Sequence, residues 1–308
     1  MNELMVIAPV AAVILIGKAL SAVGLVSITT FRETNSILYW VSIPAMLFRM
    51  TAQADLASSG GWNLFIVAHA SFFILPFIAW GLGRMFNEDR RRLSISALVS
   101  MRSNQVFMGI PAISIALGNP GLEALSLFLA MSQAGYHLLS VSSSQLVLSG
   151  RLSMRSIFDT LLKLLQNPMI IACLVGVFCS FSGLNHIPEW VDIILKVLGD
   201  MGTGLALLGL GATITLTAVK GLLRNTWRDC TVKLVLHPLI TLILFKALPV
   251  ENTMMQVVVM TSAMPVAINS LAVSQGMGLD EKYAGELITA STILSAITLP
   301  LWIRALGI

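Results

Sequence analysis

Charged residues are scarce in this chain of 308 residues. Asp, Glu, Lys and Arg make up only 11% of the residues, whereas 56% are hydrophobic. A soluble domain uses roughly 25% charged residues to cover its surface, so this chain cannot present a water-facing surface all round. The composition excludes an ordinary soluble globular protein. It predicts an integral membrane protein whose apolar faces are covered by lipid.

Cysteine is scarce as well, with three residues in the chain, of which Cys173 and Cys179 share one apolar run. We interpret these cysteines as packing residues, because they give no disulfide framework. The sequence also lacks a Cys/His cluster with metal-ligand spacing, a phosphate-binding G-x-x-x-x-G-K-[ST] loop and a nucleophile elbow. We therefore predict no enzyme, no cofactor and no bound metal. The basic residues lie in short loops between apolar runs, which is typical of membrane topology and not of nucleic-acid binding.

Ten apolar stretches are long enough to cross a hydrocarbon core of about 30 Å, which takes around 20 helical residues. They are solid apolar runs, without the alternation of a β-barrel, so we predict an all-α integral membrane fold. The ten predicted spans cover residues 5–27, 34–53, 62–86, 93–117, 121–149, 168–185, 190–217, 228–249, 252–276 and 283–306.

Lys and Arg residues predict the orientation of these spans. If the N-terminus lies outside, the cytoplasmic loops hold twelve of the 19 basic residues and the outer loops hold three. Such an excess on one side follows the positive-inside rule. We therefore predict a multi-pass protein of the plasma membrane, the inner membrane of a bacterium, with both termini on the outer side.

The longest predicted cytoplasmic connection divides the chain near its middle. It gives a first five-helix repeat over residues 1–149, a connecting interfacial helix over 150–167 and a second five-helix repeat over 168–308. Because five is an odd number, the two repeats would have opposite orientations. Span 4 carries Pro111 and span 9 carries Pro265, half of the chain length away. Inverted repeats with paired broken helices are the sequence signature of secondary transporters.

Polar residues accompany both prolines, in RSNQVFMGIP of span 4 and in TSAMPVAINS of span 9. A proline lacks an N–H, and its ring clashes with the carbonyl four residues back. We therefore expect span 4 to open around Phe107 to Gly109 and span 9 to open before Pro265. Half-helix N-termini that meet near the midplane would form an anion site. The predicted binding residues are Arg102, Ser103, Asn104, Gly109, Pro111, Thr261, Ser262, Pro265 and Asn269.

The two asparagines are central to this hypothesis, because an amide side chain both donates and accepts hydrogen bonds. The alternative is that Asn104 and Asn269 only cap the half-helices and repair broken backbone. Gln105 can point elsewhere, since neighbouring residues on a helix face different directions. Arg102 enters deep into span 4 and is a candidate for direct contact with a carboxylate.

Other ionisable residues also lie inside the spans. Lys196 and Asp200 are four residues apart on span 7, so they can pair, and they are the candidates for ion coupling. The alternative is a pair near the outer membrane surface with little role. Lys233 lies five residues into span 8 and is expected to extend to the cytoplasmic interface. Three histidines can either relay protons or bond a carbonyl at a helix contact, namely His69, His137 and His237.

Five stretches of the chain resemble, in order, the auxin efflux carrier family of membrane transporters. They are SIPAMLF in span 2, SNQVFMGIP in span 4, LGDMGTGLALLGLGATI in span 7, VKLVLHPLI in span 8 and MPVAINSLAVS in span 9. The resemblance implies a ten-span inverted-repeat fold in which spans 4 and 9 cross near the midplane. It places Asn104, Gly109, Pro111, Pro265 and Asn269 at the crossing. It also implies transport of organic anions, and it suggests a homodimer through a scaffold of spans 1, 2, 6 and 7.

The predicted function is secondary transport of small mono- or dicarboxylates, malonate-like, malate-like or auxin-like, by alternating access. The coupling ion would be H⁺ or Na⁺. One alternative is a sodium-coupled carrier resembling the bile-acid symporters, in which Ser103, Thr261 and Ser262 hold Na⁺. A second alternative is a membrane receptor that binds the anion without transporting it.

Overall fold

The computed structural model describes residues 3–53, 61–150, 154–155, 158, 162, 165–182, 187–213 and 219–308. Nearly all of these residues are helical, and the described part of the chain contains no β-strand. This helical content agrees with the all-α membrane class that the sequence predicts. The interfacial helix predicted over 150–167 lies mostly outside the described residues.

The helices follow one another with short connections. The first half of the chain contains α1 (Glu3–Ala22), α2 (Ile28–Ile37), η1 (Leu38–Ser42), α3 (Ile43–Gln53), α4 (Gly61–Met85), α5 (Arg90–Val99), η2 (Gln105–Gly109) and α6 (Ile110–Ser149). The second half contains α8 (Pro168–Phe181), α9 (Glu189–Thr213), α10 (Val219–Thr231), η3 (Val232–Leu236), α11 (His237–Ala247), α12 (Asn252–Ala263), α13 (Ser270–Gly276) and α14 (Glu281–Ala305).

Each predicted apolar span overlaps one or more of these helices within the described residues, although α2 begins six residues before span 2 and α10 begins nine residues before span 8. Spans 4 and 5 are divided inside α6, where Gly118 has a φ of 63° that only glycine adopts without strain. Five segments are long and apolar enough to cross a membrane by themselves, and two shorter apolar helices accompany them. The five are Gly61–Met85, Gln105–Gln133, Glu189–Ala212, Gly221–Ala247 and Glu281–Ala305, and the shorter two are Ala12–Ala22 and Pro168–Ser180.

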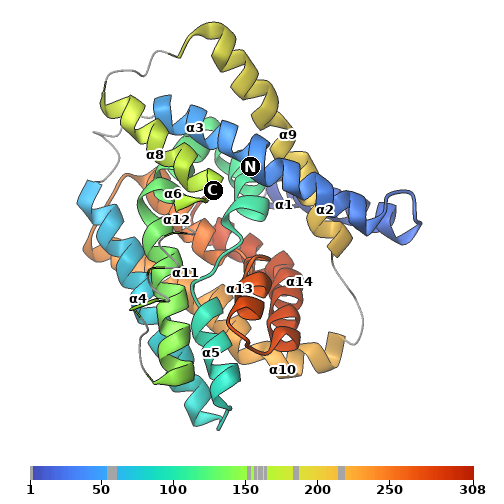
Figure 1. Cartoon of the computed structure of the whole chain (residues 1–308), viewed down its shortest axis with the longest axis vertical. Helices are drawn as coiled ribbons and strands as arrows, with labels where there is room; N and C mark the ends of the chain where they lie inside the picture. The colour runs from blue at the N-terminus through green and yellow to red at the C-terminus, as the bar shows by residue number, and fades with distance from the viewer. Residues whose placement is uncertain are drawn as a thin grey trace.

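The helices form two groups. The first group consists of α1, α2, η1, α3, α8 and α9, which lie in the upper part of Figure 1, where α1 and α3 pack on α9 and α3 also packs on α8. A Cβ at Gly17 or at Gly211 would collide with a carbonyl oxygen of the facing helix, so these glycines let α1 and α9 approach closely. The second group contains the remaining helices, and it corresponds to spans 3, 4, 5, 8, 9 and 10.

A wider helical turn precedes three of the prolines. The π-helical turns η1, η2 and η3 end two residues before Pro44, Pro111 and Pro238. A proline cannot donate to the carbonyl four residues back and its ring clashes with it, and a π-turn relieves this clash by changing the hydrogen-bond register. The carbonyl freed by Pro238 belongs to Leu234, and it accepts a bond of 2.9 Å from the Trp302 indole.

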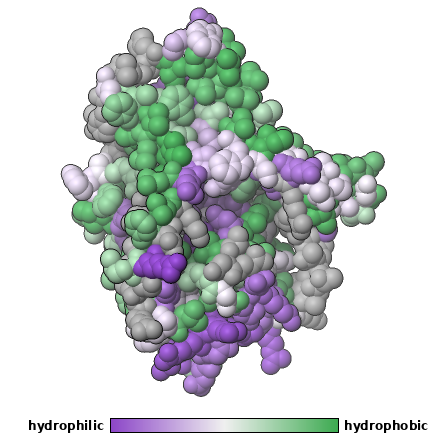
Figure 2. All heavy atoms as spheres, in the orientation of Figure 1, coloured by the Kyte–Doolittle hydropathy of each residue, from purple (hydrophilic) through white to green (hydrophobic). Residues whose placement is uncertain are grey.

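Hydrophobic side chains cover much of the outer surface. On α9, Trp190, Ile193 and Val197 are all more than half exposed, as expected for residues that face lipid. Figure 2 shows hydrophilic residues gathered at the lower end of the view, where Figure 1 places α5 and α10. The sequences of α5 and α10 carry arginines that the positive-inside rule assigns to the cytoplasmic side.

Candidate functional site

Span 4 opens earlier along the chain than the sequence predicts. Helix α5 ends at Val99, residues 100–104 are not helical, and η2 begins at Gln105. The predicted opening around Phe107 to Gly109 is therefore wrong. The physical reason is the π-turn before Pro111, in which the Gly109 N–H donates to the Asn104 carbonyl at 3.0 Å. The chain accommodates the proline in this turn without opening there.

Span 9 opens around Pro265, as predicted, because residues 264–269 between α12 and α13 are not helical. This segment lies antiparallel to the open segment of span 4. The Asn104 N–H donates to the Pro265 carbonyl at 2.8 Å, and the Ala267 N–H donates to the Arg102 carbonyl at 2.9 Å. Ser103 and Val266 are thereby paired. Each half of the chain thus satisfies backbone groups that are freed in the other half.

A cavity of about 90 Å³ lies at these paired segments. It is lined by residues of η1, η2, α6 and the start of α8, and by the segment that precedes α13. Its lining contains no Asp or Glu among the described residues. The polar lining residues are Tyr39, Ser103, Asn104, Gln105, Gln133, Tyr136, His137, Asn167 and Asn269.

Of the three asparagines that line this cavity, Asn104 and Asn269 belong to the open segments of spans 4 and 9. Asn104 is 3% exposed, and its Nδ2 atom has no hydrogen-bond partner among the described residues. The Oδ1 atom of Asn269 accepts a bond of 3.0 Å from the Arg102 guanidinium. Since a guanidinium only donates, this bond leaves the NH₂ group of Asn269 for other partners. Two amide donors in one cavity suit a carboxylate ligand.

Backbone repair does not account for Asn104. The open segments are satisfied by backbone bonds and by other side chains, such as the Ser291 hydroxyl, which accepts from the Val266 N–H at 3.0 Å. The Asn104 side chain makes no capping bond to η2. The first N–H groups of a helix have no intrahelical acceptor, and those of η2 belong to residues that line the cavity, including Val106 and Phe107. The arrangement favours a binding role for Asn104 over a capping role.

Arg102 lies behind the cavity and not in its lining. Its side chain is fully buried, with Nε 3.0 Å from the Ser270 hydroxyl and Nη1 3.0 Å from the Ser140 hydroxyl. The guanidinium also lies 5.1 Å from the centre of the Tyr136 ring. Arg102 therefore positions Asn269 and Tyr136, and its charge acts on the cavity through them.

Lys233 corrects a second sequence prediction, because it does not extend to the membrane surface. Its side chain is fully buried beside the paired segments. The Nζ atom lies 2.8 Å from the Ser103 hydroxyl, 2.6 Å from the Ser262 carbonyl and 3.1 Å from Nδ1 of His237. An ammonium has three N–H donors, so three neighbours match its capacity. These bonds keep Lys233 inside the protein, because its extension to water would leave the Ser262 carbonyl without this donor.

The remaining predicted residues of the site have structural partners. Thr261 and Ser262 donate their hydroxyls to the Val257 and Val258 carbonyls one turn back, at 2.7 and 2.8 Å. Gly109 closes the π-turn on Asn104, and Pro111 stands in the first turn of α6. These residues shape the break, and none of them lines the cavity.

Lys196 and Asp200 lie on α9, and both side chains are exposed. Among the described residues they form no ion pair with each other. The acid of α9 that does pair is Asp192, whose carboxylate lies 2.6 Å from the Arg49 guanidinium of α3. Neither Lys196 nor Asp200 lines the cavity.

Span 5 supplies three site residues that sequence reasoning missed, Gln133, Tyr136 and Ser140, beside His137, which the sequence analysis considered. Four polar residues of this span recur at the spacing of one helix face, namely Gln133, Tyr136, His137 and Ser140. A polar face on an apolar span is the feature of the sequence that could have predicted their role. Gln133 donates to the Gln105 side chain at 3.1 Å, and both line the cavity. Gln105 therefore faces the site. Of the other histidines considered, His69 bonds the Phe65 carbonyl at 2.8 Å.

The buried cations near the cavity have no acidic partner. Among the described residues, neither Arg102 nor Lys233 forms an ion pair. Their hydrogen-bond partners are hydroxyls, a carbonyl, an amide and imidazoles. Buried charges are ordinarily paired, and a guanidinium stays protonated in proteins, so no acid among the described residues balances the charge of Arg102.

An all-helical chain with membrane-length apolar helices and a buried polar cavity at two helix breaks is a multi-pass membrane protein. Comparison with known proteins defines it further. Residues 4–303 match the membrane transport protein family, and the chain belongs to this family. The resemblance to auxin efflux carriers is thereby confirmed, and the protein is a transporter and not an enzyme.

Two archaeal relatives extend over almost the whole chain. The chain is 23% identical over 301 residues to an uncharacterized transporter of Methanocaldococcus jannaschii, and 94% of each protein is covered. It is also 23% identical over 296 residues to an uncharacterized transporter of Methanothermobacter thermautotrophicus, covering 94% of this chain and 93% of the relative.

Proposed function

We propose that the protein is a secondary transporter of small organic anions that binds a carboxylate in the cavity at the two helix breaks. The observation that carries this proposal is the combination of unpaired amide donors with buried cations that have no acid beside them. A carboxylate in the cavity would accept from Asn104 and Asn269 and would balance the charge of Arg102.

The size of the cavity favours small aliphatic acids. Pockets for drug-sized ligands have volumes of about 300–1,000 Å³, whereas this cavity has about 90 Å³. A malonate-like or malate-like acid suits this space better than an auxin-like acid with an indole ring. We therefore place short mono- and dicarboxylates first among the substrates.

The two helix groups suggest how transport takes place. We propose that the first group is a scaffold and that the second group carries the paired breaks of spans 4 and 9 as one unit. The two backbone bonds between the open segments would keep the breaks together during movement. In this proposal the chain crosses the membrane ten times, as two inverted repeats. Rigid-body motion of one helix group against the other would expose the site to each side of the membrane in turn.

The contacts of Lys233 speak against sodium coupling. The Ser103 hydroxyl and the Ser262 carbonyl, which the sodium hypothesis assigns to Na⁺, are within hydrogen-bond distance of the Lys233 Nζ. Thr261 donates its hydroxyl to its own helix. An ammonium thus takes the ligands that a bound cation would use. We expect substrate uptake into proteoliposomes to be unchanged when choline replaces Na⁺, and a loss of uptake in choline would restore the sodium-coupled alternative.

Substitutions of Asn104 test the binding role directly. Asp caps a helix as well as Asn does, so Asn104→Asp keeps a capping role but places a negative charge beside the ligand. We expect both Asn104→Asp and Asn104→Ala to lose uptake by about 100-fold while folded protein is retained, because like charges or lost donors cost a few kcal/mol. Asn63→Ala, whose amide bonds the Pro249 carbonyl outside the cavity, is the control. Normal uptake by Asn104→Asp would show that the Asn104 amide does not bind the anion.

A further inference from the structure

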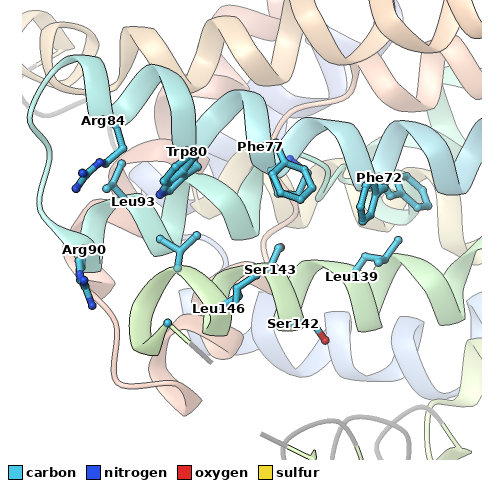
Figure 3. Close-up of a pocket in the computed structure, with 14 residues that line it drawn as sticks. Phe72, Phe77, Trp80, Arg84, Arg90, Leu93, Leu139, Ser142, Ser143 and Leu146 are labelled. Atoms are coloured by element: carbon cyan, nitrogen blue, oxygen red, sulfur yellow. The ribbon is translucent and has the colours of Figure 1, made fainter. Parts of the chain in front are cut away.

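A second, larger hollow lies away from the site, between α4 and the C-terminal part of α6. It is a groove of about 570 Å³, and its lining shares no residue with the cavity at the breaks. Figure 3 shows Phe72, Phe77 and Trp80 of α4 above Leu139 and Leu146 of α6. Phe77 is 53% exposed and Trp80 is 44% exposed, so the groove is open on its outer side.

Two arginines stand at one end of this groove. Arg84 lies in the last turn of α4, and Arg90 is the first residue of α5. Figure 3 shows both at the end of the groove that is nearest Trp80. Both side chains are exposed, and neither forms an ion pair or a side-chain hydrogen bond among the described residues.

The two acids in the loop between α4 and α5 form no ion pair with Arg84 or Arg90 among the described residues. Glu88 pairs with Arg92 at 3.4 Å and with Arg228 at 3.2 Å. Asp89 caps α5 by accepting from the Arg92 N–H at 2.9 Å. The positive charge at the end of the groove is therefore left for a ligand.

The groove has the length of one lipid leaflet. From Phe72 to Arg84 the α4 axis rises by about 18 Å, which is a little over half of a hydrocarbon core of about 30 Å. An apolar wall of this length ends in a tryptophan and two cations, and this is the order in which acyl chain, interface and headgroup follow one another in a leaflet.

We propose that this groove binds an anionic phospholipid, with one acyl chain between α4 and α6 and the phosphate between Arg84 and Arg90. Basic pockets between membrane helices on the cytoplasmic side are typical sites for such headgroups. The volume and the apolar wall exclude a free phosphate as the intended ligand, since it would use only the arginine end. The inner end is closed by Phe72, whose ring packs against Tyr136 at 5.8 Å, so a bound chain lies directly behind the candidate site.

Lipid titrations of the purified full-length protein in mild detergent test this proposal. The probes are phosphatidylglycerol, phosphatidylcholine with the same acyl chains, and inorganic phosphate, and the readouts are bound lipid by native mass spectrometry and the Tm. A ligand that binds the folded state raises its stability. We expect one phosphatidylglycerol to bind about tenfold more tightly than phosphatidylcholine and to raise Tm, because each basic residue near a headgroup contributes about 1 kcal/mol.

Variants separate the two ends of the groove. Arg84→Gln combined with Arg90→Gln should remove the preference for phosphatidylglycerol, whereas Arg91→Gln, which removes an exposed arginine outside the lining, should keep it. Ser143→Trp should fill the groove and weaken both lipids, whereas Leu174→Trp on the exposed face of α8 should not. Equal affinity for both lipids, or an unchanged preference in the double arginine variant, would overturn the proposal. An equal rise in Tm with inorganic phosphate alone would overturn the acyl-chain part.

Discussion

Two buried polar regions of the second helix group contain arginine or lysine, but only one of them contains acids. In the first, Asp229 is 2% exposed and accepts from the Tyr283 hydroxyl at 2.6 Å, from the Ser96 hydroxyl at 2.7 Å and from Arg228 at 3.1 Å. In the second, Arg102 and Lys233 contact neutral groups only.

The difference separates a structural cluster from the proposed binding site. The Asp229 cluster joins α5, α10 and α14, and its charges are balanced within the protein. The region of Arg102 and Lys233 adjoins a cavity and leaves its charge unbalanced. Burying a charge is costly unless a partner compensates it. In the proposed function, the substrate anion supplies this compensation at the breaks.

The largest effect on stability is expected in the balanced cluster. Asp229→Ala removes the carboxylate and leaves Arg228 with Glu88 alone, which should lower the free energy of unfolding by about 3 kcal/mol. Thermal and denaturant unfolding in detergent measure this change. Asp200→Ala, an exposed acid on α9, is the control and should change stability by less than about 0.5 kcal/mol. Equal stability of the two variants would remove the distinction between the regions.

Substitution of Lys233 is expected to lower stability less than Asp229→Ala does, and to weaken anion binding as well. Lys233→Met leaves the Ser262 carbonyl without its donor, which should cost about 1–2 kcal/mol. Anion affinity should fall roughly tenfold, which corresponds to about 1.4 kcal/mol. Titration of carboxylates and unfolding are measured on the same preparations, with Lys246→Met on the exposed face of α11 as the control. Unchanged anion affinity in Lys233→Met would assign this lysine to the structure alone.

The smallest effect is expected at Trp302. Trp302→Phe keeps the ring but removes the indole donor to the Leu234 carbonyl, which should cost about 1 kcal/mol. Anion affinity should stay the same, because Trp302 lies outside the cavity lining. Trp190→Phe on the exposed part of α9 is the matched control. A stability equal to that of the control would show that the carbonyl freed by Pro238 needs no partner.

The elements of the fold follow from the sequence because lipid imposes long apolar helices. The ten apolar runs locate the described helices well, and Pro265 locates the break in span 9. The break predicted in span 4 from Pro111 is misplaced, because a π-turn can accommodate a proline without opening the helix. Sequence alone gives no means of choosing between these two responses.

The sequence predicts only some residues of the candidate site, because it does not show which helices pack together. Asn104 and Asn269 stand out as amides beside a break, and both line the cavity. Lys233 is misplaced because its depth along span 8 does not reveal the open segments that approach it from two other helices. Arg102 has the expected depth, but only the packing of α6 and α13 shows that its guanidinium is already occupied.

Binding of matched acids and amides tests the unbalanced charge most directly. Calorimetric titration would compare carboxylates from acetate to succinate with the corresponding neutral amides, for the unmodified protein and for Arg102→Gln. The unbalanced charge of Arg102 predicts that at least one acid binds ten times or more tightly than its amide, because a tenfold difference in affinity corresponds to about 1.4 kcal/mol. The same charge predicts that Arg102→Gln reduces the difference in affinity between the acid and its amide. Equal binding of every acid and its amide, or no binding of any acid, would contradict an anion site at the helix breaks.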